Sequence, residues 1–259
     1  MKISIVTPSY NGRRFLDATA GSILSQSGDF ELEWVVVDGG STDGTIEFLR
    51  ELKDARVRWT SEPDRGQSHA INKGMDAATG DVVAWLNTDD VYAPEALAEV
   101  ARTFSQMPAA RWLVGRCEVI DESDQPIRSA VVRYKERFLR RYSYRALLRE
   151  NFISQPAVFW RRDFGREVGP LDESLHWTMD YDLWLRMGSR AAPVFVDKLL
   201  ARFRLHPQSK TGKVERRQFD EQYAVACRYF GEDRMSRIVH RFNVEKIVWA
   251  YRVMRVLGI

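Results

Sequence analysis

The chain has little cysteine and histidine, and it lacks a long hydrophobic run. Its two cysteines, Cys117 and Cys227, do not have metal-site spacing and are too few for a disulfide framework, which indicates a reducing compartment. No stretch approaches the roughly 18 to 20 apolar residues of a membrane span. The apolar run at residues 3–6 is too short for a signal peptide. We therefore expect a cytoplasmic protein.

Excess charge and glycine-rich phosphate loops are also missing. The net charge is only +3 over 259 residues, which does not by itself suggest a nucleic-acid partner. The turn after the first predicted strand reads Thr7-Pro8-Ser9-Tyr10-Asn11-Gly12, which is not Gly-x-Gly-x-x-Gly. No Gly-x-x-x-x-Gly-Lys-Ser/Thr occurs either. The dinucleotide and P-loop interpretations therefore lose their main support.

Strand and helix patterns alternate through residues 1–104. Apolar runs predict strands at residues 2–8, 32–37, 57–61 and 82–86, and helical spacing predicts helices at residues 14–26, 45–52, 66–78 and 94–104. Such alternation predicts an α/β fold, Rossmann-like, with a mostly parallel sheet and helices on both faces. Polar residues that follow the strands would then lie along one rim of the sheet.

The pattern loosens after residue 104. Strands are predicted at residues 112–121, 127–133, 156–160, 194–196 and 200–205, with a hairpin around residues 124–126 and a helix over residues 180–188. From residue 214 onward the chain is mainly helical in pattern. We place a boundary near residue 210, between the sheet and a helical C-terminal extension.

Two adjacent carboxylates, Asp89 and Asp90, follow the fourth predicted strand. Like charges repel, so we expect a positive group between them, and a divalent cation is the simplest candidate. Asp38, after the second strand, can accept a hydrogen bond from a base N–H, and Tyr10 can supply an aromatic surface. These residues indicate an enzyme that handles a phosphorylated ligand. Capping of the helix near Pro94 is the structural alternative for the carboxylate pair.

Five ordered motifs resemble glycosyltransferase family 2, whose members have the GT-A fold. They are Thr7-Pro8-Ser9-Tyr10-Asn11, Val36-Val37-Asp38-Gly39-Gly40-Ser41-Thr42-Asp43-Gly44-Thr45, Ser61-Glu62-Pro63-Asp64-Arg65-Gly66, Ala70-Ile71-Asn72-Lys73-Gly74 and Leu86-Asn87-Thr88-Asp89-Asp90. A later segment, residues 179–186, resembles the region that holds the family's catalytic carboxylate. The resemblance covers residues 1–210 and divides them into a nucleotide-binding half, residues 1–104, and an acceptor half, residues 105–210.

The resemblance implies an inverting, metal-dependent transfer of a sugar from a nucleotide-sugar donor, usually a UDP-sugar. The acceptor would be a hydroxyl of a glycan or lipid-linked molecule, in surface polysaccharide or glycolipid synthesis, and the cofactor Mn²⁺ or Mg²⁺. Carried over by position, Asp38 would bind the nucleotide base, with Pro8 and Tyr10 lining its pocket, and Asp64 and Arg65 would lie near the nucleotide base and the diphosphate. Asp89 would contact the ribose or the metal, and Asp90 would contact the metal. Asp180 would be the general base of the reaction.

Two positions depart from the family's pattern. Asn87 replaces the first aspartate of the frequent Asp-x-Asp-Asp motif, so it should make a ribose or structural contact. Met179 replaces the glutamate that often precedes the catalytic aspartate, which leaves Asp182 as a rival to Asp180. On a helix these two side chains point about 200° apart, so only one can face the cleft.

Three further residues are weaker site candidates. Arg204 and His206 are candidates for the diphosphate, because they resemble an Arg-x-His element that many relatives carry on a loop closing over the donor; a plain surface or packed histidine is the alternative for His206. Trp177 could stack on the acceptor sugar. Asp38 and Asp64 could simply stabilise loops, while Trp85, Trp160 and Trp184 lie among apolar neighbours and are predicted to be core residues.

Two basic segments could contact other molecules. Residues 134–145 mix cations with aromatic residues, a pattern that suits nucleic acid, membrane headgroups or a solvated helix face; we expect no nucleic-acid partner. Residues 234–259 contain six Lys or Arg against one acid, Glu245, with an apolar stripe of Val244, Ile247, Val248, Tyr251 and Met254. A basic amphipathic helix of this kind predicts weak peripheral binding to the inner face of an anionic membrane. Packing on the domain or on a second subunit is the alternative.

Two other functions remain open from the sequence. A nucleotidyltransferase could use the same sheet edge and metal, but it would need a glycine-rich basic loop, which Asn11-Gly12-Arg13-Arg14 only faintly offers. A non-catalytic nucleotide-sugar-binding scaffold is the other alternative, and it would bind donor without turnover.

Overall fold

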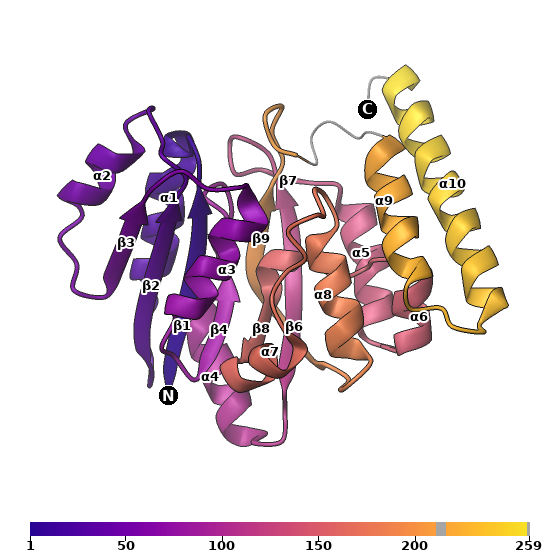
Figure 1. Cartoon of the computed structure of the whole chain (residues 1–259), viewed down its shortest axis with the longest axis horizontal. Helices are drawn as coiled ribbons and strands as arrows, with labels where there is room; N and C mark the ends of the chain where they lie inside the picture. The colour runs from indigo at the N-terminus through magenta and orange to yellow at the C-terminus, as the bar shows by residue number, and fades with distance from the viewer. Residues whose placement is uncertain (211–215, 258–259) are drawn as a thin grey trace.

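A single nine-stranded sheet runs through the protein (Figure 1). The computed structural model describes residues 1–210 and 216–257. The strands are β1 (Lys2–Ser9), β2 (Glu31–Asp38), β3 (Val57–Ser61), β4 (Val82–Trp85), β5 (Val91–Tyr92), β6 (Trp112–Ile120), β7 (Pro126–Ile127), β8 (Val158–Arg161) and β9 (Val194–Arg204). Their order across the sheet is β3-β2-β1-β4-β8-β6-β9-β5, and β7 pairs with β6.

The four strands predicted in the first half form the parallel part of the sheet. β1 pairs in parallel with β2 and with β4, and β2 pairs in parallel with β3. The chain moves outward from β1 to β3 and then returns to the other side of β1, so the strand order reverses between β1 and β4. In α/β sheets, ligands bind beyond the carboxyl ends of the strands at such a reversal. Tyr10 and Asp89, which follow these two strands, lie at that edge.

Helices cover both faces of the sheet, as predicted. They are α1 (Arg13–Leu24), α2 (Thr45–Glu51), α3 (Gln67–Ala77), α4 (Ala96–Gln106), α5 (Ser129–Leu139), α6 (Tyr144–Arg149), α7 (Arg162–Val168), α8 (Met179–Gly188), α9 (Arg216–Cys227) and α10 (Arg234–Leu257), with a short 3₁₀ turn, η1 (Gln155–Ala157). Neighbouring residues on β1 point to opposite faces: Ile5 packs with residues of α1 and α4, whereas Val6 packs with residues of α3 and α8. The α/β architecture is therefore confirmed.

The second half of the sheet is mixed, and one predicted strand there is wrong. Residues 127–133 were predicted to be a strand, but only Pro126–Ile127 pairs with β6, and α5 begins at Ser129. Arg128 adopts a left-handed conformation, φ 53°, which ends the strand and starts the helix. The β-branched residues Val131 and Val132 suggested a strand, but they lie in α5 instead.

Two smaller differences concern the edge of the sheet. The strands predicted at residues 194–196 and 200–205 are one strand, β9, whose register against β6 shifts between Gly115 and Cys117. The predicted break is thus an irregularity within a continuous strand. The short strand β5 was not predicted; it begins directly after Asp90 and pairs with β9, so it joins the loop that contains Asp89 and Asp90 to the edge of the sheet.

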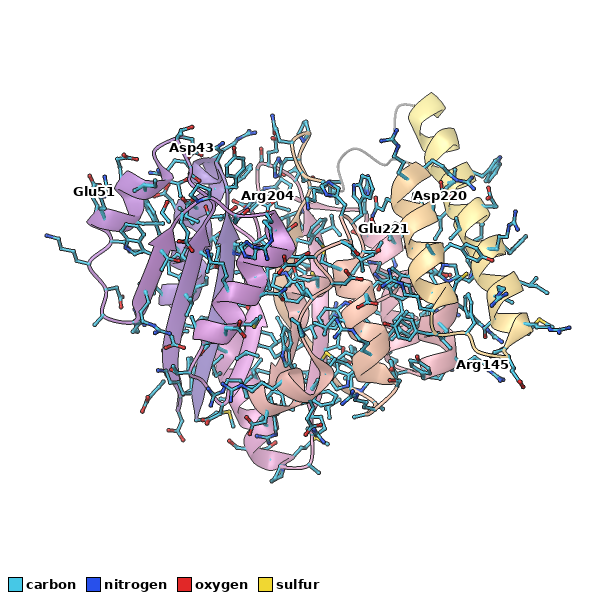
Figure 2. All side chains as sticks on the ribbon, in the orientation of Figure 1. Asp43, Glu51, Arg145, Arg204, Asp220 and Glu221 are labelled. Atoms are coloured by element: carbon cyan, nitrogen blue, oxygen red, sulfur yellow. The ribbon has the colours of Figure 1, made fainter. Side chains whose placement is uncertain are left out.

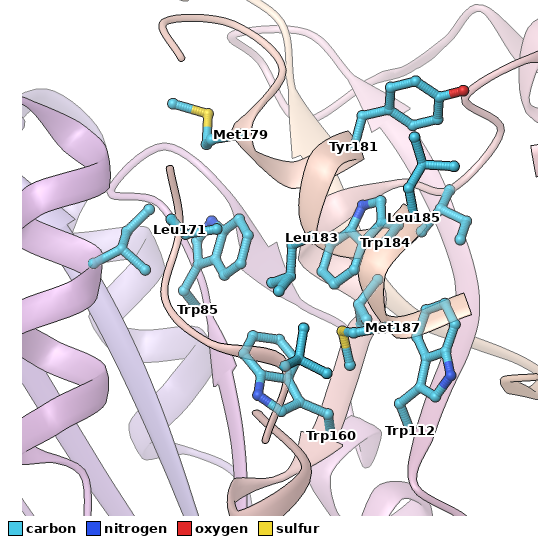
Figure 3. Packing of buried hydrophobic residues seen from close by; sticks show 14 of the residues in the cluster. Trp85, Trp112, Trp160, Leu171, Met179, Tyr181, Leu183, Trp184, Leu185 and Met187 are labelled. Carbon is cyan, nitrogen blue, oxygen red and sulfur yellow. The ribbon is translucent and has the colours of Figure 1, made fainter. Parts of the chain in front are cut away.

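A group of tryptophans attaches α8 to the sheet (Figure 3). The ring of Trp184 on α8 stacks on Trp85 of β4, with centroids 5.7 Å and planes 11° apart. It also stacks on Trp112 of β6, at 6.0 Å and 13°. Trp160 of β8 meets Trp85 edge-on at 5.8 Å. All four rings are buried, which confirms the predicted core role of Trp85, Trp160 and Trp184.

The two C-terminal helices share this core. Val225 and Ala226 of α9 belong to the same hydrophobic cluster as Trp184, and α10 packs against α9 and α6. The last strand ends before the predicted boundary near residue 210, and helices follow it. These helices pack against the preceding part of the chain. Within residues 1–210 and 216–257, no helix is both long enough and apolar enough to cross a membrane.

Replacing the central tryptophan should weaken the attachment of α8. We expect Trp184→Ala to lower the free energy of unfolding by about 3–5 kcal/mol, because it removes a large buried ring that stacks on two others. Urea denaturation followed by far-UV circular dichroism measures this change. Trp249→Ala is a matched control, since Trp249 is 66% exposed and its loss should change stability by less than about 0.5 kcal/mol. Equal losses in the two variants would contradict the anchoring role.

Candidate active site

The two carboxylates after β4 have different surroundings. Asp90 is fully buried; its Oδ1 accepts a hydrogen bond from the backbone N–H of Arg204 at 2.9 Å and its Oδ2 accepts one from Asn87 Nδ2 at 3.1 Å. Asp89 keeps 23% of its side chain exposed, and its Oδ2 lies 3.0 Å from Nε2 of His206. The structure therefore turns Asp90 inward and presents Asp89 at the rim, and Asn87 makes the structural contact that was one of its two expected roles.

The predicted repulsion between the two carboxylates is present, and positive groups of the protein lie beside them. Burial, and secondly the charge of Asp89, raises the pKa of Asp90 well above its usual range, against the hydrogen bond from the Arg204 N–H. The hydrogen bond to Asp89 in turn raises the pKa of His206. The segment at the end of β9 thus supplies a backbone N–H donor to Asp90 and a ring nitrogen to Asp89.

Arg204 is used inside the protein rather than at the rim. Its side chain is only 1% exposed. Nε donates to the carbonyl oxygen of Asp89 at 2.9 Å, Nη1 to the carbonyl oxygen of Asp121 at 3.0 Å, and Nη2 lies 2.7 Å from Asp124 Oδ1. The guanidinium carbon also lies 4.8 Å from the ring centre of Phe15. Every guanidinium nitrogen thus has a partner within the protein, and Arg204 stabilises the loop that follows β4. This geometry does not favour the expected contact between Arg204 and the diphosphate.

Asp89 and His206 are the residues that best fit a divalent cation. In the part of the chain that the structure describes, no group of three or more His, Cys, Asp or Glu side chains could hold a metal ion. Mg²⁺, however, is commonly held by one or two protein ligands together with substrate phosphates and water. A carboxylate and a neutral imidazole can serve in this way. Asp90 fits the role less well than expected, because both of its oxygens already accept hydrogen bonds from N–H donors.

Asp38 organises the loop that follows β2. The side chain is fully buried. Its Oδ2 accepts hydrogen bonds from the backbone N–H groups of Gly40 and Ser41, at 3.0 and 2.9 Å, and from Ser61 Oγ at 2.7 Å. Its Oδ1 accepts a hydrogen bond from Ser41 Oγ. These contacts match the alternative role of Asp38, in which it stabilises the loop. Asp38 would then affect a bound nucleotide base only indirectly, through the conformation of this loop.

An open shelf lies beside the loop. Tyr10 is 70% exposed. A Cβ atom placed on Gly39 would lie 2.6 Å from Asp64 Oδ2 and 3.3 Å from Tyr10 Cδ2, so Tyr10 and Asp64 converge on the Gly39 backbone and a larger residue there would displace the Asp64 carboxylate. Asp64 also forms its turn, with Oδ1 accepting the N–H of Gly66 at 2.7 Å. We call Tyr10, Gly39 and Asp64 the base shelf.

Two other predicted residues border this shelf in different ways. Pro8 is buried in β1 and faces Val37 of β2 in the register, so it lies below the loops and supports them. Arg65 is exposed, and its Nε and Nη2 lie 3.2 and 2.8 Å from Glu173 Oε2. Arg65 therefore connects the nucleotide-side loop to the segment that leads into α8.

The structure distinguishes the two candidate bases on α8. Asp180, in the first turn, is half-buried, and burial raises its pKa to about 6, against the positive charge of Lys135 on α5. Asp182 is 2% exposed, and it accepts hydrogen bonds from Arg186 Nε at 2.9 Å and from Tyr229 Oη at 2.7 Å. Asp182 is thus a buried, ion-paired structural group, whereas Asp180 has the pKa expected of a base that works near neutral pH.

Glu221 on α9 holds the segment before Asp180 and was not identified from the sequence. Its Oε2 accepts the N–H of His176 at 3.0 Å, and its Oε1 accepts the N–H groups of Trp177 and Thr178 at 2.8 Å. Oε1 also accepts the Thr178 hydroxyl at 2.8 Å. Figure 2 shows Glu221 on the side of α9 toward α8. A carboxylate from a distant helix therefore binds three successive N–H groups in the segment before α8, the last of which belongs to the N-cap residue Thr178.

Two more side chains lie on this side of the site. Lys135 belongs to the basic segment at residues 134–145. Burial lowers the pKa of Lys135, while the charges of Cys117, Asp180 and Glu150 raise it. Trp177 is half-buried, and its ring meets His176 edge-on at 4.6 Å. The surroundings of Lys135 could not be deduced from local sequence, because Cys117, Asp180 and Glu150 come from separate parts of the chain.

Residues 4–165, more than half of the chain, match the family described as "Glycosyl transferase family 2". The chain belongs to glycosyltransferase family 2. This confirms the resemblance seen in the sequence and supports a transferase.

Curated relatives agree with this family. The chain is 32% identical over 197 residues to a PGL/p-HBAD biosynthesis glycosyltransferase of Mycobacterium bovis, covering 74% of this chain and 71% of that protein. It is 34% identical over 133 residues to an uncharacterized glycosyltransferase of Nostoc, covering 50% of this chain and 41% of that protein. An uncharacterized glycosyltransferase of Rickettsia felis is 27% identical over 220 residues, and the chain spans only 35% of its length. The matches thus cover well under half of several longer relatives.

Solved structures show the same fold. S. aureus TarS in complex with UDP-GlcNAc superposes with a TM-score of 0.68 at 16% identity, covering 93% of this chain and 70% of that chain. The mannosyltransferase PcManGT from Pyrobaculum calidifontis, in complex with GDP-Man and Mn²⁺, gives a TM-score of 0.66 at 18% identity, covering 87% and 64%. At these identities the comparison concerns the fold, and the predicted GT-A fold is confirmed.

The charge next to Asp180 gives a prediction that needs no enzyme assay. Carboxyl ¹³C NMR of aspartate-labelled protein should show Asp180, assigned by comparison with Asp180→Asn, titrating near pH 6. Lys135→Met should raise this pKa further, because the neighbouring positive charge favours the carboxylate. Lys198→Met, at an exposed position on β9, is the control and should leave the titration unchanged. An unchanged titration in Lys135→Met would contradict the proximity of the two groups.

Proposed function

We propose that the protein transfers a sugar from a nucleotide-sugar donor, most simply a UDP-sugar, to a hydroxyl of a glycan or lipid-linked acceptor. Transfer would invert the anomeric carbon and depend on Mn²⁺ or Mg²⁺. The observation that carries the proposal is the convergence of Asp89 with His206 at the rim where β4 ends, together with Asp180 at the start of α8. Because α8 runs from that rim toward the opposite end of the sheet, its first turn faces the same edge (Figure 1).

The donor would lie along the rim from the base shelf to Asp89. Tyr10 offers an exposed aromatic face for the base, and Asp64 Oδ2, close to the Gly39 backbone, offers an acceptor for a base or ribose group. Asp38 would act by holding the loop in the conformation that leaves this shelf open. TarS with UDP-GlcNAc and PcManGT with GDP-Man have the same fold, which supports a nucleotide-sugar donor of either kind.

Asp89 and His206 would be the protein ligands of a divalent cation that binds together with the donor's diphosphate. When bound, it would neutralise the charge that develops on the leaving diphosphate and would orient that group. Asp90 would act indirectly, because its hydrogen bond to the Arg204 N–H keeps the ends of β4 and β9 together. Arg204 would hold the Asp89 backbone through its carbonyl oxygen. The Mn²⁺ in the PcManGT complex supports this assignment of a metal.

Asp180 would accept the proton of the acceptor hydroxyl as its oxygen attacks the anomeric carbon. Its Oδ1 accepts the backbone N–H of Tyr181 at 2.6 Å, so Oδ2 is the atom proposed to take the proton. A pKa of about 6 leaves this carboxylate ionised at neutral pH and more basic than an ordinary aspartate. Glu221 would hold the preceding segment in place, and Trp177 within that segment would offer a surface for the acceptor sugar.

The biological setting proposed is the synthesis of a surface polysaccharide or glycolipid at the cytoplasmic face of a membrane. A relative named for PGL/p-HBAD biosynthesis supports a biosynthetic role. A lipid-linked acceptor would place the reaction at a membrane surface, which agrees with the basic C-terminal helix.

A panel of nucleotide sugars tested by calorimetry with and without Mn²⁺ should identify at least one donor whose binding depends on the metal. Asp89→Asn and His206→Ala should each weaken that metal-dependent binding at least about tenfold, because each removes one of few protein ligands. Asp17→Asn on the exposed face of α1 is the matched control and should bind normally. Metal-dependent binding that survives in both site variants would place the cation elsewhere, with Asp90 as the next candidate.

Replacement of the base should separate binding from chemistry. Asp180→Asn should leave the donor Kd nearly unchanged and lower kcat at least about a hundredfold, since the amide cannot accept the proton. Asp182→Asn should instead lower the free energy of unfolding, because it leaves Arg186 without its buried charge partner. Single-turnover kinetics and urea denaturation of both variants provide the measurements. Normal turnover by Asp180→Asn would exclude it as the base.

A further inference from the structure

Four large apolar side chains are exposed in a row on α10. Met235, Ile238, Phe242 and Trp249 have 61%, 64%, 68% and 66% of their surface exposed. Their spacings of three, four and seven residues place them on one stripe of the helix. Single exposed apolar residues are common, but several large ones on one helical stripe mark an interaction surface. The charged residues Glu245 and Lys246 occupy the turn between Phe242 and Trp249. We call these four residues the outer stripe; α10 lies at the edge of the molecule farthest from β3 (Figure 1).

The outer stripe is separate from the face that attaches α10 to the protein. Val244 and Val248 are buried against Phe219 of α9, with Ile247 beside them. His240 is fully buried, and its Nδ1 lies 2.8 Å from the carbonyl oxygen of Leu148. The apolar stripe predicted from the sequence is therefore the packing face as far as Val248. Tyr251 and Met254 of that stripe lie outside the residues whose side chains are described.

Cations border the outer stripe. Arg234 and Arg241 on one side and Lys246 on the other are exposed, as is Arg237. The single acid of the helix, Glu245, is paired with Arg216 of α9 at 2.7 Å, so its charge is balanced within the protein. An apolar stripe between basic side chains matches a bilayer surface, in which the stripe enters the acyl boundary and the cations meet anionic headgroups.

We propose that the outer stripe docks the protein on an anionic lipid surface, with α10 lying in the plane of the headgroups. A second copy of the chain is a poorer occupant, because a symmetric interface would bring the same arginines and lysine of both copies together. The proposal concerns membrane attachment and does not depend on the reaction at the sheet rim. The membrane would then lie on the side of α10 away from α9, the helix whose Glu221 holds the segment before Asp180.

Vesicle flotation of the full chain tests the proposal. The protein should float with vesicles that contain phosphatidylcholine and phosphatidylglycerol, and should stay behind with phosphatidylcholine alone. Ile238→Glu combined with Phe242→Glu should lower the floating fraction at least about fivefold, because charge at the acyl boundary is unfavourable. Met107→Glu combined with Val131→Glu is the matched control, since these exposed apolar residues lie on other elements. Raised salt should weaken binding of the parent protein.

Three results would overturn the proposal. The first is a parent protein that does not float with the anionic vesicles. The second is a double α10 variant that floats as well as the control variant. The third is light scattering that shows a dimer in the parent protein and a monomer in the α10 variant, which would assign the outer stripe to a second copy. Thermal unfolding of both variants should match the parent, because all four altered side chains are exposed.

Discussion

The stack of Trp184 between Trp85 and Trp112 is the contact on which the arrangement of the active site depends. Trp85 ends β4, four residues before Asp89, and Trp184 lies one helical turn after Asp180. The ring contact therefore joins the strand that presents the donor-side carboxylate to the helix that presents the proposed base. Because flat rings packed at 5.7 and 6.0 Å leave little freedom to slide, the two halves of the site keep a defined separation.

The charges of the site are balanced by partners that are far away in sequence. Asp90 is held by the N–H of Arg204, and Asp89 faces His206, so the end of β9 completes the end of β4. Asp180 similarly depends on surroundings from α5 and α9. Burial favours the protonated forms of Asp90 and Asp180; the Arg204 N–H opposes this effect at Asp90, and the charge of Lys135 opposes it at Asp180. The reactivity of each carboxylate is thus set by which elements pack around it.

The C-terminal helices join the acceptor side of the site to the outer surface. α9 contributes Glu221 to the segment before Asp180 and packs its apolar face into the core that contains Trp184. α10 packs on α9 and leaves an apolar stripe bordered by cations on its outer face. Removal of these helices would therefore affect both the alignment of the proposed base and the proposed attachment to a lipid surface.

The sequence by itself determined the strands and helices of the first half, the placement of Asp89 and Asp90 at a strand end, and the family. These follow from local periodicity and from motifs within a few residues, which need no knowledge of long-range contacts. Only the tertiary structure decided that Asp90 is buried while Asp89 is presented, that Arg204 is internal, that Glu221 serves the α8 terminus, and which stripe of α10 is exposed. Burial and hydrogen-bond partners depend on packing between distant segments, and a single sequence pattern fits more than one such packing.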